Sequence, residues 1–531
     1  MNISRRGFLY TATAAGAIGF VRLDAQEADG RKVFRHGVAS GDPLSDRVIL
    51  WTRVTAPESA TPEVAWQVSP EASFKRVVAS GKVTTRAARD FTVKIEAASL
   101  EPGMTYYYRF DALGERSPVG RTRTLPGPGV SRVRLAIASC SNFPFGYFNA
   151  YKRIAERTDL DAVLHLGDYI YEYGNGGYGD GTALNRIPEP DKEITSLTDY
   201  RTRYAQYRRD PDLQELHRQH PMIVVWDDHE FANNTWRDGA ANHNPDRGEG
   251  DWPPRAQAAV QAYLEWLPIR EDRSTRRVRI YRTFSFGDLA DLVMLDTRYI
   301  DRDRQADKRE LLAVIDDPKR TLLGSAQEHW LAEELQASGR AGVTWQLLGQ
   351  QVLFAPGSLA GAPSTSTDTW DGYRPARDRL FDAVEAARLK NVVVLTGDIH
   401  TSYGYDVVRN PWSGYNPETG AGTTAVEFAA PSITSPSGLG TSDHEERIKA
   451  LYSARPHLKF VDGLYRGYVV LDVSRERVQA DWFGVPTITE RTNSEQFVKG
   501  LFSVAGEPRL QLASGPATPS TSGAAPAPRG A

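Results

Sequence analysis

The distribution of apolar and polar positions divides the chain into two parts with different predicted folds. Between residues 33 and 126, short segments either alternate in polarity or combine β-branched and aromatic residues. Pro, Gly, Asp and Ser separate these segments, as is typical of an all-β domain. The segments predicted to be strands are residues 48–52, 63–68, 91–95 and 105–110.

The last of these strands follows a turn at residues 100–104 and contains a run of three tyrosines at residues 106–108. A tyrosine just after such a turn is similar to the tyrosine corner of fibronectin type III and immunoglobulin-like sandwiches. We therefore expect residues 33–126 to form an N-terminal β-sandwich that shapes or shields a site elsewhere. The sequence Pro-Gly-Pro-Gly at residues 126–129 is predicted to be the linker that ends this domain.

After the linker, the apolar runs become continuous, each ends in a polar cluster, and helical or loop segments separate them. Continuous Val/Ile/Leu runs predict strands buried on both faces, and hence a layered α/β domain over residues 131–485. Amphipathic helices are predicted at residues 200–209 and 255–266, and a glycine-rich, mobile loop at residues 174–186. The predicted strands are residues 133–138, 162–166, 222–226, 292–295, 345–348 and 392–395.

The first residues resemble an export signal. Arg5 and Arg6 precede a short apolar run at residues 10–21, and Ala25 offers a cleavage point, so residues 1–25 are similar to a twin-arginine signal. A membrane anchor is the alternative, but the run is shorter than the roughly 20 apolar residues that a span needs. We expect a protein exported through the twin-arginine machinery to the periplasm or the medium.

Composition narrows the possible partners. The formal net charge of −3 indicates no basic footprint for nucleic acid and no strong attraction to anionic membranes, so no stable partner of either kind is expected. The single cysteine, Cys140, cannot form an internal disulfide and is either an inert core residue or a functional thiolate. The Ala, Pro, Ser and Gly composition of residues 510–531 predicts a disordered tail.

Residue types that bind metals follow four of the predicted strands. In an open α/β sheet, ligands bind beyond the carboxyl ends of the strands. Each residue type alone has an ordinary structural explanation, such as a small buried thiol, a Gly-Asp turn or an acidic helix N-cap. Their joint occurrence at successive strand ends favours a metal site instead. The four strand ends carry Cys140, then Asp168 with Tyr171, then Asp227, Asp228 and His229, and finally Asp398 with His400.

The spacing of these residues resembles a known family. Gly-Asp-x-x-Tyr at 167–171, the acid–His–Glu cluster at 227–230 and Gly-Asp-x-His at 397–400 are similar to the calcineurin-like metallophosphoesterases, particularly the purple acid phosphatase branch. Cys140, in place of the usual Asp, resembles the alkaline phosphatase D (PhoD-like) family. That family also has an N-terminal β-domain and a twin-arginine signal. The resemblance covers residues 33–483 and implies an αββα catalytic domain.

The resemblance also implies ligands for two metal ions. Cys140, Tyr171, His400 and the shared carboxylate Asp168 would hold Fe(III), because thiolate and phenolate suit a strongly Lewis-acidic ion. Asp168 would bridge to a second ion completed by Asp228 and Asp398. All-oxygen donors favour a hard cation, which implies Ca²⁺, with Mg²⁺ or Mn²⁺ as alternatives. For an additional calcium, the candidates are Asp227 and Asn233.

The implied activity is the hydrolysis of phosphomonoesters or phosphodiesters by a metal-bridged oxo or hydroxide nucleophile. His229 would donate a hydrogen bond to the phosphoryl group or a proton to the leaving oxygen, or else order the groups around Asp228. Arg298 is a candidate to contact phosphate, with a surface ion pair as the alternative.

Two other classes of function are alternatives to a hydrolase. Twin-arginine cargo often carries redox centres, but the sequence has no haem attachment pair, cysteine cluster or Gly-x-Gly-x-x-Gly loop. A non-catalytic surface-binding protein built around the β-sandwich would leave the ligand-type residues of the larger domain unexplained. Phosphate-ester hydrolysis is therefore the preferred interpretation.

Overall fold

The computed structural model describes residues 32–271, 278–307, 311–358, 366–440, 442–520 and 523–528. The predicted export signal at residues 1–25 lies outside these ranges. Within them, none of the helices combines the length and apolarity that crossing a membrane requires.

The N-terminal part is a β-sandwich, as predicted. Residues from both of its sheets share one core, which includes Val48 and Val93 on one side and Val64 and Phe110 on the other. The Tyr106 hydroxyl accepts a hydrogen bond from the Glu101 N–H at 2.9 Å, which confirms the tyrosine corner. One sheet has β1 (Val38–Gly41), β2 (Arg47–Arg53) and β5 (Thr92–Ala98), and the other β3 (Glu63–Ser69), β4 (Ala79–Thr84), β6 (Thr105–Ala112), β7 (Glu115–Arg116) and β8 (Gly120–Arg123).

The first of these sheets continues into the larger domain. Strand β1 pairs in parallel with β11, so the domains share a ten-stranded sheet ordered β22-β21-β20-β19-β9-β10-β11-β1-β2-β5. The linker at residues 126–129 therefore separates two stretches of sequence but not two sheets. The remaining strands of this sheet are β9 (Arg132–Ala138), β10 (Ala162–His165), β11 (Pro221–Val224), β19 (Arg466–Ser474), β20 (Arg477–Val485), β21 (Gln496–Val504) and β22 (Glu507–Leu512).

A seven-stranded sheet packs against the ten-stranded one. Val393 and Phe428 of this sheet lie in the same core as Leu135 and Leu471 of the other. The parallel strands β13, β14, β15 and β17 form its centre. In sheet order the strands are β12 (Arg282–Phe286), β13 (Ala290–Met294), β14 (Trp345–Gln350), β15 (Val392–Thr396), β17 (Ala425–Ala429), β16 (Ser402–Val407) and β18 (Leu458–Asp462).

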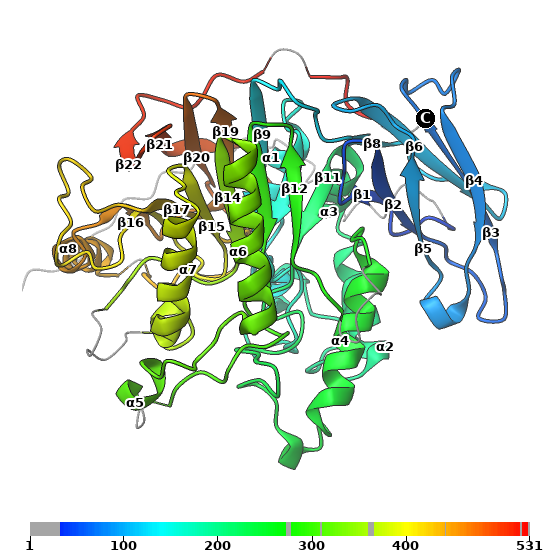
Figure 1. The fold of residues 1–531 in the computed structure, drawn as a ribbon. Coiled ribbons are helices and arrows are strands. Elements are labelled where there is room, and N and C mark those ends of the chain that lie inside the picture. The colour runs from blue at the N-terminus through cyan, green and yellow to red at the C-terminus, as the bar shows by residue number, and fades with distance from the viewer. Residues whose placement is uncertain are drawn as a thin grey trace, which may run out of the picture.

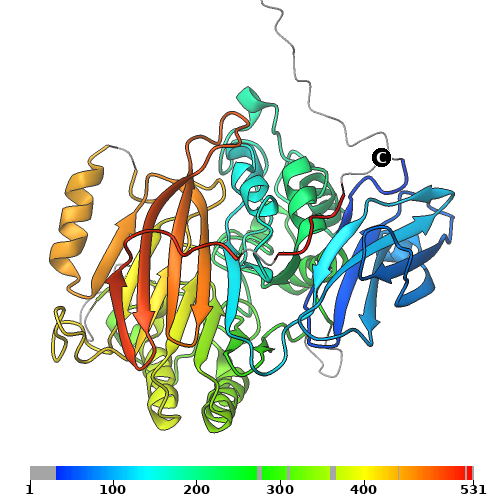
Figure 2. The same ribbon diagram turned by 90° about the horizontal axis from the view of Figure 1, so that it is seen from above.

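Helices cover the outer faces of both sheets, which gives the expected αββα layers (Figures 1 and 2). Helices α6 and α7 bury Leu335 and Phe381 against the seven-stranded sheet. Helix α2 begins at a capping box formed by Ser196 and Asp199. The helices are α1 (Asn149–Ala155), α2 (Leu197–Tyr207), α3 (Pro211–Gln219), α4 (Trp252–Trp266), α5 (Leu311–Ile315), α6 (Gly324–Ala341), α7 (Arg374–Ala386) and α8 (His444–Ala454).

The prediction of a disordered tail over residues 510–531 is wrong for the part that the structure describes. The ten-stranded sheet continues past residue 485 to the end of β22 at Leu512. The chain then crosses the molecule towards the N-terminal sandwich (Figure 2). Arg134 donates to the Thr518 carbonyl at 2.7 Å, and the buried Ala527 exchanges two hydrogen bonds with Gln219 at 2.9 and 3.2 Å. The contacts use the backbone of this segment, so its composition gives no sign of them.

Candidate metal centre

The carboxyl ends of the central strands of both sheets meet at one site. Cys140, Asp168 and Asp227 follow β9, β10 and β11 of the ten-stranded sheet, whereas Arg298 and Asp398 follow β13 and β15 of the other. Arg298 contacts both Asp227 and Asp398, so the two sets of strand ends lie against each other. The parallel pairing of the strands positions these residues, as the sequence predicted.

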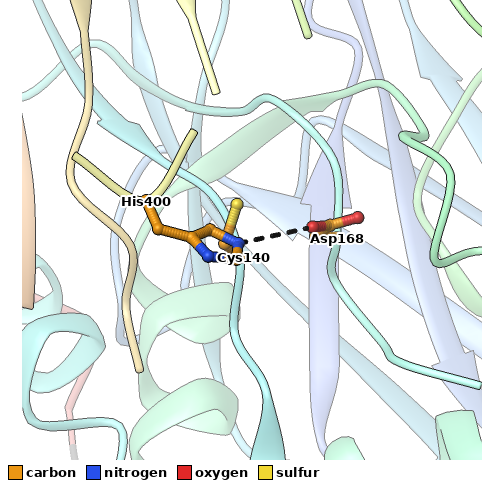
Figure 3. A group of neighbouring side chains, drawn as sticks. All are labelled: Cys140, Asp168 and His400. Atoms are coloured by element: carbon orange, nitrogen blue, oxygen red, sulfur yellow. Dashed lines mark ion pairs between the residues drawn. The ribbon is translucent and has the colours of Figure 1, made fainter. Parts of the chain in front are cut away.

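One group of potential ligands contains Cys140, Asp168 and His400, whose ligand atoms all lie within 4.8 Å of one another (Figure 3). The Tyr171 hydroxyl joins this group. It donates to Oδ2 of Asp168 at 2.9 Å and lies 3.3 Å from Nε2 of His400. The structure therefore brings together the four residues that were predicted to hold iron.

The hydrogen bonding of His400 leaves one ring nitrogen available to bind a metal. Its Nδ1 lies 3.0 Å from the carbonyl oxygen of Pro436. Because a carbonyl can only accept, Nδ1 donates to it, which leaves Nε2, 4.0 Å from Oδ2 of Asp168, as the nitrogen that could bind a metal.

The backbone at this site adopts a conformation that side chains rarely allow. Four of the ligand candidates have positive φ, namely Cys140 at 62°, Asp168 at 55°, Asp398 at 57° and His400 at 55°. Such residues cost about 1–3 kcal/mol each and cluster at functional sites. Gly167, at φ 99°, has no room for a Cβ, which would lie 2.3 Å from Cβ of Asp227. The strand ends are thus packed closely enough to require glycine there.

Electrostatics disfavour a thiolate at Cys140 and a phenolate at Tyr171. Burial, and then the Asp168 carboxylate, raise the pKa of the Cys140 thiol well above its usual value. The same two causes raise the pKa of Tyr171. A cation reverses this balance, since it stabilises thiolate and phenolate directly.

A second group of potential ligands adjoins the first. Asp168, Asp228 and His229 form one close set, and Asp227, Asp228 and Asp398 form another. Burial raises the pKa of Asp398 to about 7, even though Arg298 opposes this shift. Burial also opposes the charge of Asp228, but Arg298 and His229 outweigh it and lower the pKa of this carboxyl.

Arg298 is completely buried among carboxylates, so the surface ion pair considered for it is wrong. Its guanidinium contacts Asp227, lies 2.5 Å from Asp398 and 2.7 Å from Asp368, and approaches Asp228 to 3.8 Å. These contacts occupy the guanidinium. Its predicted contact with phosphate therefore stays a prediction.

His229 is held by a residue that the sequence analysis did not identify. Its Nδ1 lies 2.6 Å from Oε2 of Glu172, and its ring stacks on Tyr171 with centroids 4.2 Å apart. Burial alone would lower the pKa of His229, but Glu172 and Asp228 raise it well above the usual value. His229 also lines the cavity described below, so it combines a fixed orientation with access to a ligand.

Other contributors were also missed. The Glu230 carboxylate accepts hydrogen bonds from the N–H groups of Asp168, Tyr169 and Asp227 at 2.7–3.0 Å, and so ties two strand ends together. Asp368 comes from a loop with no strand signal. For Glu230, the signal in the sequence was its place in the acid–His–Glu cluster; for Asp368 we find none.

The two residues proposed for an additional calcium have different surroundings. Asp227 is paired with Arg298, whereas Asn233 lies at the cavity wall and donates its N–H to Glu172 at 2.8 Å. That site stays a prediction.

A cavity of about 280 Å³ opens over the two groups of ligands. Carboxylates, imidazoles, tyrosines and asparagines line it. The residues that line it are Asp168, Tyr173, Tyr178, Asp228, His229, Asn233, Asn234, Asp398 and His400.

The donors fit a pair of cations. Oδ2 of Asp227 and Oδ1 of Asp228 are buried and form no hydrogen bond within the described part of the chain. Unpaired buried carboxylate oxygens are costly, and a cation would satisfy them. Asp168 belongs to both ligand groups, so it could bridge two ions, one beside sulfur, phenol and imidazole and the other beside mostly carboxylate oxygens.

Comparison with known proteins gives a consistent result. Residues 135–482 match the family described as PhoD-like phosphatase, and residues 21–126 match its N-terminal domain. The chain is 38% identical over 497 residues to alkaline phosphatase D of Bacillus subtilis (strain 168), covering 90% of this chain and 82% of the relative. A solved structure titled "Structure of PhoD" superposes with a TM-score of 0.81 at 36% identity, over 93% of this chain and 94% of that one.

Proposed function

This chain belongs to the PhoD-like phosphatase family and is a phosphatase, and from this premise we propose that it hydrolyses phosphomonoesters or phosphodiesters outside the cytoplasm at a centre of Fe(III) and Ca²⁺. The proposal depends on one observation. Asp168 belongs both to the group with Cys140 and His400 and to the group with Asp228. A carboxylate shared between a set that contains sulfur and a set that contains none suits two unlike cations.

Each ion would have a distinct set of residues. Cys140, Tyr171 and His400 would hold iron together with Asp168, because soft and phenolic donors favour it over alkaline-earth ions. Asp228 and Asp398 would complete a calcium site, with Mg²⁺ or Mn²⁺ as substitutes. When bound, the metal pair would supply the Lewis acidity that activates water and neutralises the phosphoryl oxygens.

The protein's own contribution is orientation and proton transfer. Glu172 holds Nδ1 of His229, which leaves Nε2 as the nitrogen able to serve the cavity. A proton donor at this place would protonate the leaving oxygen of the ester. Glu230 fixes the loops that carry Asp168 and Asp227 and so preserves the spacing of the ligands.

The two other classes of function explain less. A redox centre would not need the second group, which consists mostly of carboxylates, and a surface-binding protein would need neither group. Export by the twin-arginine route remains part of the proposal and is supported by Arg5, Arg6 and the apolar run that follows them.

Elemental analysis combined with kinetics tests the function. Protein purified without chelators is expected to contain iron and calcium and to hydrolyse p-nitrophenyl phosphate or bis(p-nitrophenyl) phosphate. Cys140→Ala is expected to lose iron while its folded structure, followed by circular dichroism, persists. Wild-type protein with neither metal and no turnover of either ester would refute the proposal, as would a Cys140→Ala variant with full iron content and full activity.

A further inference from the structure

One side of the cavity is aromatic. Besides carboxylates and imidazoles, the cavity is lined by Tyr173 and Tyr178, whose ring centroids lie 5.8 Å apart and which together form an aromatic wall. Their hydroxyl groups make no hydrogen bond to the residues that the structure describes. Neither tyrosine is among the proposed metal ligands, and neither is the proposed proton donor. These two side chains therefore need another explanation.

The Tyr178 ring has a fixed position. It meets Phe145 edge to face at 5.3 Å and Tyr173 at 5.8 Å. Nδ2 of Asn142 donates to the Tyr178 carbonyl at 3.2 Å. A Cβ at Gly179 would lie 2.9 Å from the Phe145 ring, so glycine lets the loop approach that ring.

Hydrogen bonds also cross-link the loop itself. The Asn175 side chain donates to Asp180 at 2.9 Å and to Thr182 at 3.0 Å, and accepts from the Gly181 N–H at 2.8 Å. The aromatic wall is consequently formed before any ligand arrives, so substrate binding need not bear the cost of ordering it.

The wall stands beside the proposed proton donor. The ring centroid of His229 lies 5.7 Å from that of Tyr173 and 6.2 Å from that of Tyr178, and the Tyr178 ring is within 15° of parallel to it. A group that protonates the leaving oxygen lies next to the alcohol being released. The organic part of the leaving group would therefore be placed against the two tyrosines.

We propose that Tyr173 and Tyr178 determine substrate specificity by packing against the leaving group, and that the enzyme prefers phosphate esters whose leaving alcohol carries an aromatic or other flat ring. This inference rests on the proposed hydrolytic function. An aromatic contact of this kind adds attraction beyond the burial of apolar surface, and a flat ring gains more from it than a linear chain.

Benzyl phosphate and n-propyl phosphate test the proposal, because both release a primary alcohol and differ in the ring. If the enzyme prefers diesters, the corresponding methyl diesters replace them, with the released alcohol measured by chromatography. Wild-type kcat/KM is expected to favour the benzyl ester by about tenfold. Tyr178→Ala and Tyr173→Ala should bring this ratio down towards one, whereas Tyr178→Phe should retain it.

Tyr178→Leu keeps a bulky side chain and serves as a second variant if Tyr178→Ala does not fold. It too is expected to lower the ratio. Tyr452→Ala, at an exposed position on α8, is the matched control and should keep the wild-type ratio. A wild-type ratio within about twofold of one, or an unchanged ratio in the alanine and leucine variants, would overturn the proposal. Failure of the wild type to hydrolyse any of these esters would instead refute the hydrolytic function itself.

Discussion

Nδ1 of His229 lies 2.6 Å from Oε2 of Glu172, a side chain with no solvent exposure. The other Glu172 oxygen accepts from the Asn233 N–H at 2.8 Å and from Nδ2 of Asn242 at 3.0 Å. Burial opposes the charge on Glu172, but His229 and these hydrogen bonds lower the pKa of the carboxyl below its usual value. Glu172 thus fixes both the orientation of the His229 ring and the nitrogen that faces the substrate.

Glu172→Gln is expected to lower kcat by about 10- to 100-fold, because an amide holds the imidazole less firmly and does not stabilise its charge. KM should change little, since Glu172 does not line the cavity. Initial rates over a range of substrate concentrations separate the two parameters.

Glu189→Gln is the control for this substitution, because Glu189 is exposed and pairs with Arg209 at the surface. It should retain wild-type kcat. If Glu172→Gln also retained wild-type kcat, with unchanged metal content, Glu172 would not be a positioning residue.

Arg298→Met is expected to destabilise the metal-free protein by about 3–5 kcal/mol, because it leaves several buried carboxylates without a partner cation. Saturating calcium should recover part of this loss, since a bound cation would replace the missing charge. Urea unfolding with and without calcium measures both effects.

The exposed Arg340, which contacts Gln336 on the surface of α6, supplies the control Arg340→Met. Its unfolding free energy should stay within about 0.5 kcal/mol of the wild type. An Arg298→Met protein as stable as this control would show that the carboxylates adjust without the guanidinium.

The sequence predicted the central strands and most of the candidate site, for a physical reason. Parallel strands buried on both faces leave continuous apolar runs, and the residues just after them lie at one edge of the sheet. Cys140, Asp168 and Asp398 could therefore be identified without a structure. Their positive φ values were not predictable, because only the packing of neighbouring strand ends makes that backbone necessary.

What escaped prediction depends on contacts between distant residues. Glu172 is 57 residues from His229 in the sequence, and nothing in its local pattern separates it from a solvated glutamate. Arg298 likewise gave no sign of its burial among carboxylates. The C-terminal segment was predicted to be disordered because its composition offers no apolar periodicity, but its backbone is bound by side chains such as Gln219.

Removal of the C-terminal segment is expected to weaken the attachment of the N-terminal sandwich to the larger domain. Residues 523–528 accept hydrogen bonds from Tyr107 on the sandwich and from Arg218 and Gln219 at the end of α3. A chain that ends at Ser520 should lose about 1–3 kcal/mol of unfolding free energy, since the lost hydrogen bonds are partly offset by the entropy that the segment regains.

A double-mutant cycle tests whether the docked segment accounts for this loss. Gln219→Ala should destabilise the full-length chain more than the shortened one, because its partner Ala527 is absent from the latter. The kcat of both proteins should match the wild type, because these contacts lie at the start of β11, away from the strand end that carries Asp228. Equal effects of Gln219→Ala in the two backgrounds would argue against a docked segment.

Buried histidines are expected to make the protein sensitive to acid. Burial, and then Arg121, lower the pKa of His220 to about 3 from an ordinary value of 6.5. Between these two pH values the unfolded chain binds a proton at this residue that the folded chain does not, so stability falls as the pH decreases from 6.5 towards 3. One such group changes the unfolding free energy by about 1.4 kcal/mol per pH unit.

His220→Gln removes this titrating group, so the unfolding free energy of the variant should depend less steeply on pH than that of the wild type, by about 1 kcal/mol per unit between pH 6 and pH 4. Because the substitution also disturbs packing, the comparison concerns the slope and not the stability at one pH. Urea unfolding at half-unit pH intervals gives that slope.

His329→Gln, at an exposed position on α6, should retain the wild-type slope. Parallel curves for wild type and His220→Gln would mean that His220 takes up a proton within the folded protein, and the loss of stability in acid would then have to come from other groups.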